Sequence, residues 1–405
     1  MSFDAIILGA GPAGSTAAIV LARRGFQVAL VEKAEFPRRK VCGEFVSATS
    51  LAVIDRLGLG STWRSLAGPE VRRVALFSGE RVVTARMPAA HGAGFGRALG
   101  RDVLDDLLVQ EASRAGATLF QPFRATGVRP SGDESAVTIA SRDEEATLSA
   151  PVVIAAHGSW EPGGLPSQLQ KTNAPSDLLG FKAHFSGARL EPDLMPLLVF
   201  PGGYGGMVWA DRGRLSLSLC IRRDALAALR KEAGGGSASD AVHRHLLASC
   251  RGVRAAIGEA QLQGQWLAAG PIRPGMRARY RDDVFRIGNV AGESHPVIAE
   301  GISMAMQSAW HLAEELEAID PARRAERDAA GRRYSRRWRA QFGARILAAS
   351  AIAGLALRPA GARLMGGAIE ALPALLTLGA RLSGKTKTIA EMSNERVGVG
   401  RMRLS

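Results

Sequence analysis

The sequence predicts an α/β fold, α+β overall, in which a parallel sheet with helices is interrupted by an antiparallel sheet and followed by further helices. Three observations predict it. An apolar strand near the N-terminus leads through a glycine turn into a helix and a second strand, alternating segments follow near residue 200, and helix-forming stretches end the chain. The 405 residues, 46% of them apolar, suffice for a large core divided between domains.

The N-terminal elements form a strand, helix and strand unit. Ala5–Leu8 is an apolar run that ends at Gly9, Ala13–Leu21 is rich in helix formers, and Val28–Val31 is a second apolar run that ends at Glu32. Short apolar runs bounded by turn residues are typical of buried strands, which is why we assign both runs to a sheet.

Further elements follow along the chain. Leu215–Ile221 alternates strictly, with apolar side chains on one face and Ser216, Ser218 and Cys220 on the other. We expect helices at Arg101–Ala115 and Gly301–Leu316 and strands at Ala150–Ala156, Leu197–Phe200, Met207–Ala210 and Phe285–Gly288. The order of these elements predicts a discontinuous first domain at 1–173 and 276–330, a mainly antiparallel second domain at 174–275, and a helical C-terminal region at 331–405.

A glycine motif joins the first strand to the first helix. It consists of Gly9, Gly11, Pro12, Ala13 and Gly14 around Ala10. Glycines let the backbone approach a pyrophosphate, which the helix N-terminus attracts. Glu32 lies at the end of the second strand, where a carboxylate binds ribose hydroxyls, and we place Lys33 in the same site. This pattern predicts a Rossmann dinucleotide site but leaves FAD and NAD open.

Charge and cysteine content exclude several function classes. The net charge is +14, but the basic residues are mostly Arg, and we expect a solvated helix face rather than nucleic-acid binding for the densest stretch, Arg323–Arg339. An acidic partner or an anionic membrane surface is the alternative for that stretch. Three cysteines without metal-like spacing support neither a disulfide framework nor a metal site, and with no visible export signal we expect a cytoplasmic protein.

Three segments resemble a known family. Arg38–Leu59, Arg101–Ala115 and Arg286–Leu316 resemble the geranylgeranyl reductase family, within the wider para-hydroxybenzoate hydroxylase and flavin-dependent halogenase superfamily. The resemblance covers about residues 1 to 330. It implies FAD as the cofactor and a glutathione-reductase-like FAD-binding Rossmann domain, with an inserted antiparallel-sheet substrate domain and a helical C-terminal tail.

The resemblance also implies cofactor contacts. Arg101 would contact the FAD phosphates, and Gly288 with Asn289 would take the place of the family's Gly-Asp pair beside the ribityl or pyrophosphate group. Asn still forms hydrogen bonds but carries no charge. Pro296, Gly301 and Ile302 match the turn that aims a helix N-terminus at the isoalloxazine ring.

A second departure concerns electron supply. His157 and Gly158 follow the strand where the superfamily has Asp-Gly, and in the hydroxylases that Asp links the FAD and nicotinamide sites. The electron donor is therefore expected to be NADPH, NADH or a separate reductase.

The resemblance places catalytic and substrate residues as well. Cys42 and Glu44 match the family's Cys-Gly-Glu segment near the flavin, and either a thiol or a carboxylic acid there would supply a proton. A lone cysteine is otherwise a packing residue. His295 would bind substrate or relay a proton, or else cap the turn. Tyr204 and Trp209 would line the substrate pocket, with core packing as the alternative.

The C-terminal region contains two apolar stretches, Ile346–Leu357 and Leu364–Ala380. Both are too short or too interrupted by charged and proline residues to span a bilayer. We expect them to pack on the protein's own core. The alternatives are that they cover the substrate channel or make peripheral contact with the inner face of the membrane.

These observations predict an FAD-dependent oxidoreductase that acts on a small apolar substrate, reducing carbon-carbon double bonds of an isoprenoid, lipid-like or polyketide compound. The first alternative is a monooxygenase of secondary metabolism that acts through C4a-hydroperoxyflavin. The second is a non-catalytic lipid-binding carrier of the same fold. Halogenation is disfavoured because the chain lacks a Trp-x-Trp-x-Ile-Pro motif and any Lys between Lys40 and Lys171.

Overall fold

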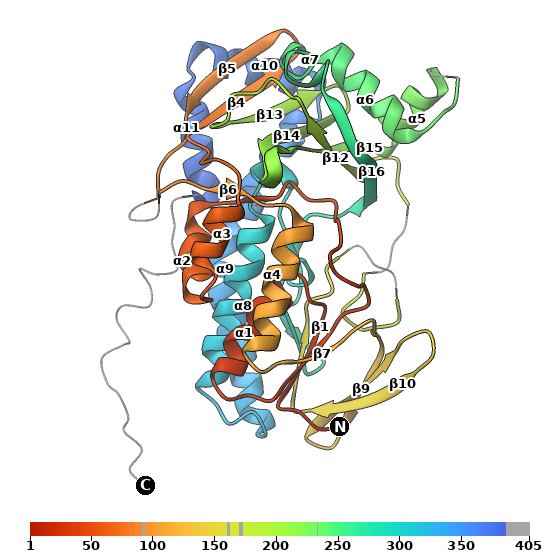
Figure 1. Ribbon diagram of the computed structural model, residues 1–405, viewed down its shortest axis with the longest axis vertical. Helices are drawn as coiled ribbons and strands as arrows, with labels where there is room; N and C mark the ends of the chain where they lie inside the picture. The colour runs from red at the N-terminus through yellow and green to blue at the C-terminus, as the bar shows by residue number, and fades with distance from the viewer. Residues whose placement is uncertain (91–93, 160–162, 170–172, 233, 386–405) are drawn as a thin grey trace.

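The computed structural model describes residues 1–90, 94–159, 163–169, 173–232 and 234–385. Figure 1 shows two halves stacked along the long axis, with the N-terminus in the lower half. The predicted mixed α/β fold is confirmed. The final part of the predicted helical region, 386–405, lies outside the described residues.

The lower half contains the predicted strand, helix and strand unit. Its six-stranded sheet has the order β18-β19-β11-β1-β2-β7. Five strands are parallel, and the edge strand β18 is antiparallel to β19. The strands are β1 (Ala5–Leu8), β2 (Val28–Val31), β7 (Thr118–Phe120), β11 (Val152–Ala155), β18 (Tyr280–Arg281) and β19 (Val284–Arg286).

Helices cover one face of this sheet and a small sheet covers the other. The helices are α1 (Pro12–Arg23), α4 (Arg101–Arg114) and α8 (Gly301–Glu317). The small sheet consists of β8 (Arg124–Ser131), β9 (Glu134–Ala140) and β10 (Glu145–Ala150), whose apolar residues pack on β1 and β2. The sequence patterns did not predict these three strands.

The upper half is built on a seven-stranded sheet with the order β16-β12-β15-β14-β13-β4-β5. The strands are β4 (Arg73–Ser78), β5 (Arg81–Arg86), β12 (Leu178–Ser186), β13 (Leu194–Phe200), β14 (Gly203–Trp209), β15 (Leu215–Arg222) and β16 (Gln261–Ile272). β4 pairs with β13 in parallel, and the other neighbours are antiparallel. The sheet therefore does not come from 174–275 alone, because β4 and β5 belong to the segment assigned to the first domain.

Short elements complete the two halves. Helices α5 (Arg223–Glu232), α6 (Ala238–Ser249) and α7 (Arg251–Ile257) pack on the upper sheet. Helices α2 (Leu51–Arg56) and α3 (Gly60–Leu66) pack on the core of the lower half. Two short strand pairs complete the fold: β3 (Phe45–Val46) with β6 (Arg97–Ala98), and β17 (Gly275–Met276) with β20 (Gly292–Glu293).

Three helices end the described chain: α9 (Arg324–Ala356), α10 (Pro359–Ala371) and α11 (Ala374–Ala380). α9 runs from the lower half to the upper half (Figure 1). Tyr334, Trp338 and Phe342 lie at four-residue spacing on it and are buried, so they form a packing stripe. Among the described residues no single helix is long and apolar enough to cross a membrane; only α9 and α10 together meet that length and composition, and they are bent by 105°.

Candidate active site

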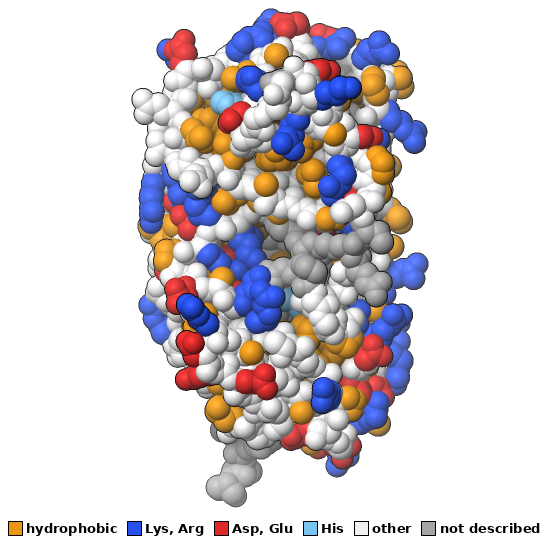
Figure 2. Space-filling view, turned by 90° about the vertical axis from the view of Figure 1, so that its right-hand side faces the viewer, with side chains coloured by type: hydrophobic (Ala, Val, Ile, Leu, Met, Phe, Trp, Pro, Cys, Tyr) orange, Lys and Arg blue, Asp and Glu red, His pale blue; other side chains and the backbone are white. Residues whose placement is uncertain are grey.

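One cavity extends from the lower sheet to the upper sheet, and basic side chains gather beside a hollow at mid-height of the molecule (Figure 2). Its lining brings together most of the predicted site residues. They are Gly9, Gly11, Pro12, Ala13, Glu32, Lys33, Cys42, Glu44, Arg101, Tyr204, Gly288, Asn289, Pro296, Gly301 and Ile302. Gly14, Trp209 and His295 do not line it.

The glycine turn is shaped by contacts that leave no room for a side chain. Gly9 has φ +109°, and a Cβ there would lie 2.8 Å from the Ala156 carbonyl oxygen. A Cβ on Gly14 would lie 1.8 Å from the Gly9 oxygen, so α1 approaches β1 only because residue 14 is glycine. A Cβ on Gly11 would meet nothing closer than the Arg101 guanidinium at 3.7 Å. Gly11 therefore presents its backbone to the cavity.

Charged side chains lie beside this glycine turn and form hydrogen bonds around it. Glu32 is buried and accepts hydrogen bonds from the Ala10 amide at 2.8 Å and from Arg38 at 3.1 Å. Arg101 donates to both oxygens of Asp105 at 2.6 and 2.8 Å. Burial alone would lower the pKa of Arg101, but the charge and hydrogen bonds of Asp105, together with the contact to Cys42, raise the net pKa, so Arg101 remains a cation.

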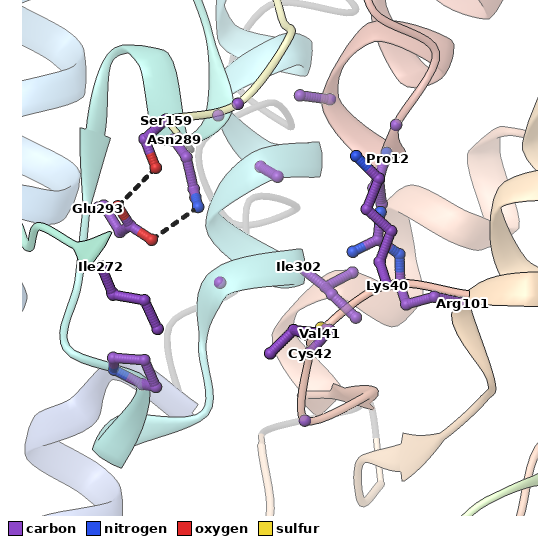
Figure 3. A pocket seen from close by; sticks show the side chains of 18 of the residues that line it. Pro12, Lys40, Val41, Cys42, Arg101, Ser159, Ile272, Asn289, Glu293 and Ile302 are labelled. Atoms are coloured by element: carbon purple, nitrogen blue, oxygen red, sulfur yellow. Dashed lines mark hydrogen bonds between the residues drawn. The ribbon is translucent and has the colours of Figure 1, made fainter. Parts of the chain in front are cut away.

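The first turn of α8 lines the same cavity as the glycine turn, on a different side. A Cβ on Gly301 would meet no atom within 4 Å, so the helix N-terminus opens onto free space. Asn289 donates to Glu293 at 3.1 Å, and Ser159 donates to the other Glu293 oxygen at 2.7 Å. Figure 3 shows these three side chains across the cavity from Pro12, Lys40 and Arg101, with Ile302 and Cys42 between the two sides. Glu293 thus places a negative charge beside Asn289, where an aspartate at position 289 would have carried one itself.

A buried ion pair lies behind the Cys42 segment. Glu44 has φ +62°, is 1% exposed, and forms a salt bridge with Lys182 of β12. Its other oxygen accepts a hydrogen bond from His184 Nε2 at 2.7 Å, and its Oε1 accepts one from the Arg101 amide at 3.0 Å. Burial alone would raise the pKa of Glu44, but the charge of Lys182 and the hydrogen bond of His184 hold it well below its usual range. Glu44 is therefore a carboxylate held in place by Lys182, His184 and the Arg101 amide, which favours its ionised form.

Tyr204 and His295 form a second polar pair. The Tyr204 hydroxyl, which lines the cavity, shares a hydrogen bond with His295 Nδ1 at 3.0 Å. Burial lowers the pKa of His295 to about 4, so its imidazole is neutral near pH 7. Trp209 instead donates to the Leu190 carbonyl at 2.9 Å and packs against the upper core, which agrees with the core-packing alternative.

Comparison with known proteins assigns the cofactor. Residues 2–339, most of the chain, match the family described as FAD binding domain. The chain belongs to this FAD-binding family. It is an FAD-dependent oxidoreductase.

The FAD-binding chain is similar to several reductases. It is 27% identical to digeranylgeranylglycerophospholipid reductase 2 of Methanopyrus kandleri, over 85% of this chain and 84% of that protein. It is 32% identical to a menaquinone reductase of Mycobacterium tuberculosis over 142 residues only, so the chain spans about a third (34%) of the length of that relative.

Solved structures share the fold of the FAD-binding chain. The geranylgeranyl bacteriochlorophyll reductase-like protein of Thermoplasma acidophilum has a TM-score of 0.72 at 19% identity and covers 97% of this chain and 94% of its own. The myxobacterial chondrochloren halogenase has a TM-score of 0.76 at 18% identity, over 95% and 91%. At these identities the likeness shows the fold alone.

The cavity residues fit FAD. Gly9 and Gly11 leave backbone accessible at the N-terminus of α1, where it would hold the pyrophosphate. Glu32 would hold the ribose, and the open N-terminus of α8 would face the flavin ring. Arg101 remains charged beside Asp105, and its guanidinium lies next to Gly11, where it would contact the phosphates of a bound FAD.

Four residues of this site were not predicted from the sequence. Asp105 lies one helical turn after Arg101, a spacing that identifies ion pairs on helices. Lys182 and His184 occupy alternate positions of an apolar strand, so both face the same side. Glu293 carries no local signal, because it acts through Asn289 and Ser159 from distant elements.

His295 should make the protein sensitive to acid. The pKa of His295 is about 4 in the folded chain and about 6.5 when unfolded. A histidine with a lowered folded pKa contributes stability above pH 6.5 that is lost as the pH falls toward 4. His295→Gln should therefore lose less stability than the wild type between these pH values, measured as urea unfolding of the FAD-loaded protein. His245→Gln on α6 retains His295 and should lose as much stability as the wild type between these pH values. Equal losses of stability in all three proteins would refute the role of His295 in acid sensitivity.

Proposed function

We propose that this FAD-dependent oxidoreductase reduces carbon-carbon double bonds of an apolar isoprenoid, lipid-like or polyketide substrate. The proposal rests on one observation: the cavity is lined by glycines and charged side chains at the cofactor end and by apolar side chains at the other end. Beyond the cofactor residues it is lined mainly by apolar side chains, namely Met195, Leu197, Met207, Val208, Leu219, Ile272 and Val297. Such a lining suits a long apolar molecule. The similarity to digeranylgeranylglycerophospholipid reductases over most of both chains supports the same substrate class.

When bound and reduced by the electron donor, FAD would supply the hydride that one alkene carbon receives and would return to its oxidised form, and the second carbon needs a proton. Cys42 is the candidate donor, because its half-buried thiol lies beside the Arg101 guanidinium at the boundary between the cofactor and substrate ends. Glu44 is held ionised and instead fixes the loop that carries Cys42. Tyr204 lies near the apolar end, where its hydroxyl would orient the substrate, and neutral His295 would position that hydroxyl from outside the cavity.

The test is an anaerobic reaction. Protein reduced with dithionite and mixed with a geranylgeranyl lipid should regain oxidised flavin absorbance and yield a product with two added hydrogens. Cys42→Ala should slow this step by about 100-fold, the lower range for loss of a general acid. Cys250→Ala, which removes a buried thiol from the upper core, should keep the wild-type rate.

Two outcomes would contradict the proposal. Reoxidation that requires air, with one oxygen atom in the product, would assign a monooxygenase. Anaerobic reduction that is unaffected by Cys42→Ala would keep the reductase but remove Cys42 as the donor. NADPH, NADH and a separate reductase can be compared as electron donors in the same apparatus.

A further inference from the structure

Exposed leucines are concentrated on the C-terminal helices. Eleven large hydrophobic side chains are exposed on the described chain, and six of them lie between residues 347 and 382. Leu364 is 74% exposed, more than any of the others. We call these six side chains the leucine face: Leu347, Leu355, Leu364, Leu372, Leu378 and Leu382. Single exposed leucines are ordinary, but a concentration of this kind marks an interaction surface.

The spacing places these leucines on the outer sides of their helices. Leu347 and Leu355 are two turns apart on α9, Leu364 and Leu372 are two turns apart on α10 and its end, and Leu378 and Leu382 are one turn apart. The opposite sides are buried in the upper half, through Ala349, Ala353, Ala356, Ile369, Leu376 and Ala380. Each helix is therefore apolar on both sides, which packing within the chain does not explain.

The charges around the leucine face are mostly positive. Arg358, Arg363 and Arg381 are exposed among the leucines. Glu370 is the acidic residue of this segment, and it pairs with Arg81 at 2.7 Å. The whole chain carries a net charge of +14. Apolar side chains bordered by arginines match the interface of a membrane that contains anionic lipids.

The same helices also cover the apolar end of the cavity. Ile369, Leu376 and Ala380 pack in one cluster with Met195 and Val208, which line the cavity. Ala349 and Ala353 of α9 pack in another cluster with Ile272 and Val297, which line it as well. One layer of helix therefore separates the leucine face from the apolar end of the cavity.

We infer that the leucine face docks the protein on the surface of an anionic phospholipid membrane, with α10 and α11 lying in the interface (Figure 1). A second copy fits less well, because a twofold contact would bring six arginines together with only two acidic residues, the Glu370 of each copy, which already pairs with Arg81. A membrane surface buries the leucines and supplies the countercharge at once. The inference concerns where the enzyme works and does not depend on the reaction it performs.

The test is flotation of the FAD-loaded full chain with vesicles of phosphatidylcholine alone or with phosphatidylglycerol. The wild type should float with the anionic vesicles and at least tenfold less with the neutral ones. The combined variant Leu355→Gln, Leu364→Gln and Leu378→Gln should bind anionic vesicles at least tenfold more weakly, because each substitution removes apolar area from the lipid contact. All three side chains are exposed, so the fold should be retained.

Matched controls separate docking from general effects. Leu66→Gln, Leu262→Gln and Met276→Gln alter exposed apolar side chains elsewhere and should leave vesicle binding unchanged. Equal binding by both triple variants would overturn the inference. A wild type that does not float, but is dimeric and becomes monomeric in the leucine-face variant, would assign the face to a second copy. Because no substrate is present, failure here is distinct from failure of the reductase assay.

Discussion

Lys182→Met is expected to destabilise the folded protein by about 3 kcal/mol near pH 7, because it leaves the buried Glu44 carboxylate without its cation. The sign of the pH dependence follows from Glu44. The folded pKa of Glu44 lies well below the value of about 4.3 expected in the unfolded chain, so the ion pair stabilises above that pH and its contribution is lost as the pH falls. The difference between wild type and variant in urea unfolding should therefore shrink in acid.

Two further variants show whether charge is the cause. Lys182→Met combined with Glu44→Gln should recover most of the lost stability, because no uncompensated charge remains. Lys231→Met alters an exposed lysine on α5 and should change the free energy of unfolding by less than about 0.5 kcal/mol. If Lys182→Met lowered the free energy of unfolding no more than Lys231→Met does, the ion pair would not be what holds the Cys42 loop.

Gly14→Ala is expected to abolish FAD binding. The new methyl group would lie 1.8 Å from the Gly9 carbonyl oxygen, so α1 must move away from β1 and the glycine turn loses its shape. The purified variant should be colourless, and its affinity for added FAD, measured by flavin fluorescence quenching, should fall by at least about 100-fold, or close to 3 kcal/mol.

Unfolding has to be distinguished from loss of the cofactor. Gly11→Ala places its methyl group in open space, 3.7 Å from Arg101, so the chain should keep its circular dichroism spectrum while FAD binding weakens. Gly354→Ala on α9 meets no atom within 4 Å and should retain both the fold and the yellow colour. Retention of wild-type FAD affinity by Gly14→Ala would contradict the assigned role of the turn.

Local patterns predicted the first strands and the main helices of the lower half closely, although they did not predict β8, β9 and β10. The strand at Ala5–Leu8 matches β1, and the helix expected at Arg101–Ala115 matches α4 to one residue. These elements depend on apolar runs, turns and helix periodicity, all of which are visible within a short window of sequence. The glycine turn and Glu32 were predicted from this local pattern, whereas Arg101, Asn289 and the turn before α8 were predicted from the family resemblance.

Long-range pairings could not be predicted in this way. β4 pairs with β13 more than a hundred residues later, and no local pattern distinguishes this partner from another strand. Glu44 meets Lys182 and His184 well over a hundred residues later in the chain, and these contacts together favour its ionised form. Sequence motifs therefore identified where Glu44 lies but not its protonation state, which depends on residues that the fold brings to it.

The length of α9 limits how the two halves can move. Its 33 residues form a continuous rod of about 50 Å. Near one end the Tyr334 hydroxyl donates to the Arg286 carbonyl of β19, and near the other Ala349 and Ala353 pack beside Tyr204. A hinge motion that opened the halves would have to bend this rod or break both attachments. The enzyme should therefore admit its substrate through local rearrangement at the rim, while the distance between the cofactor and the apolar end stays constant during turnover.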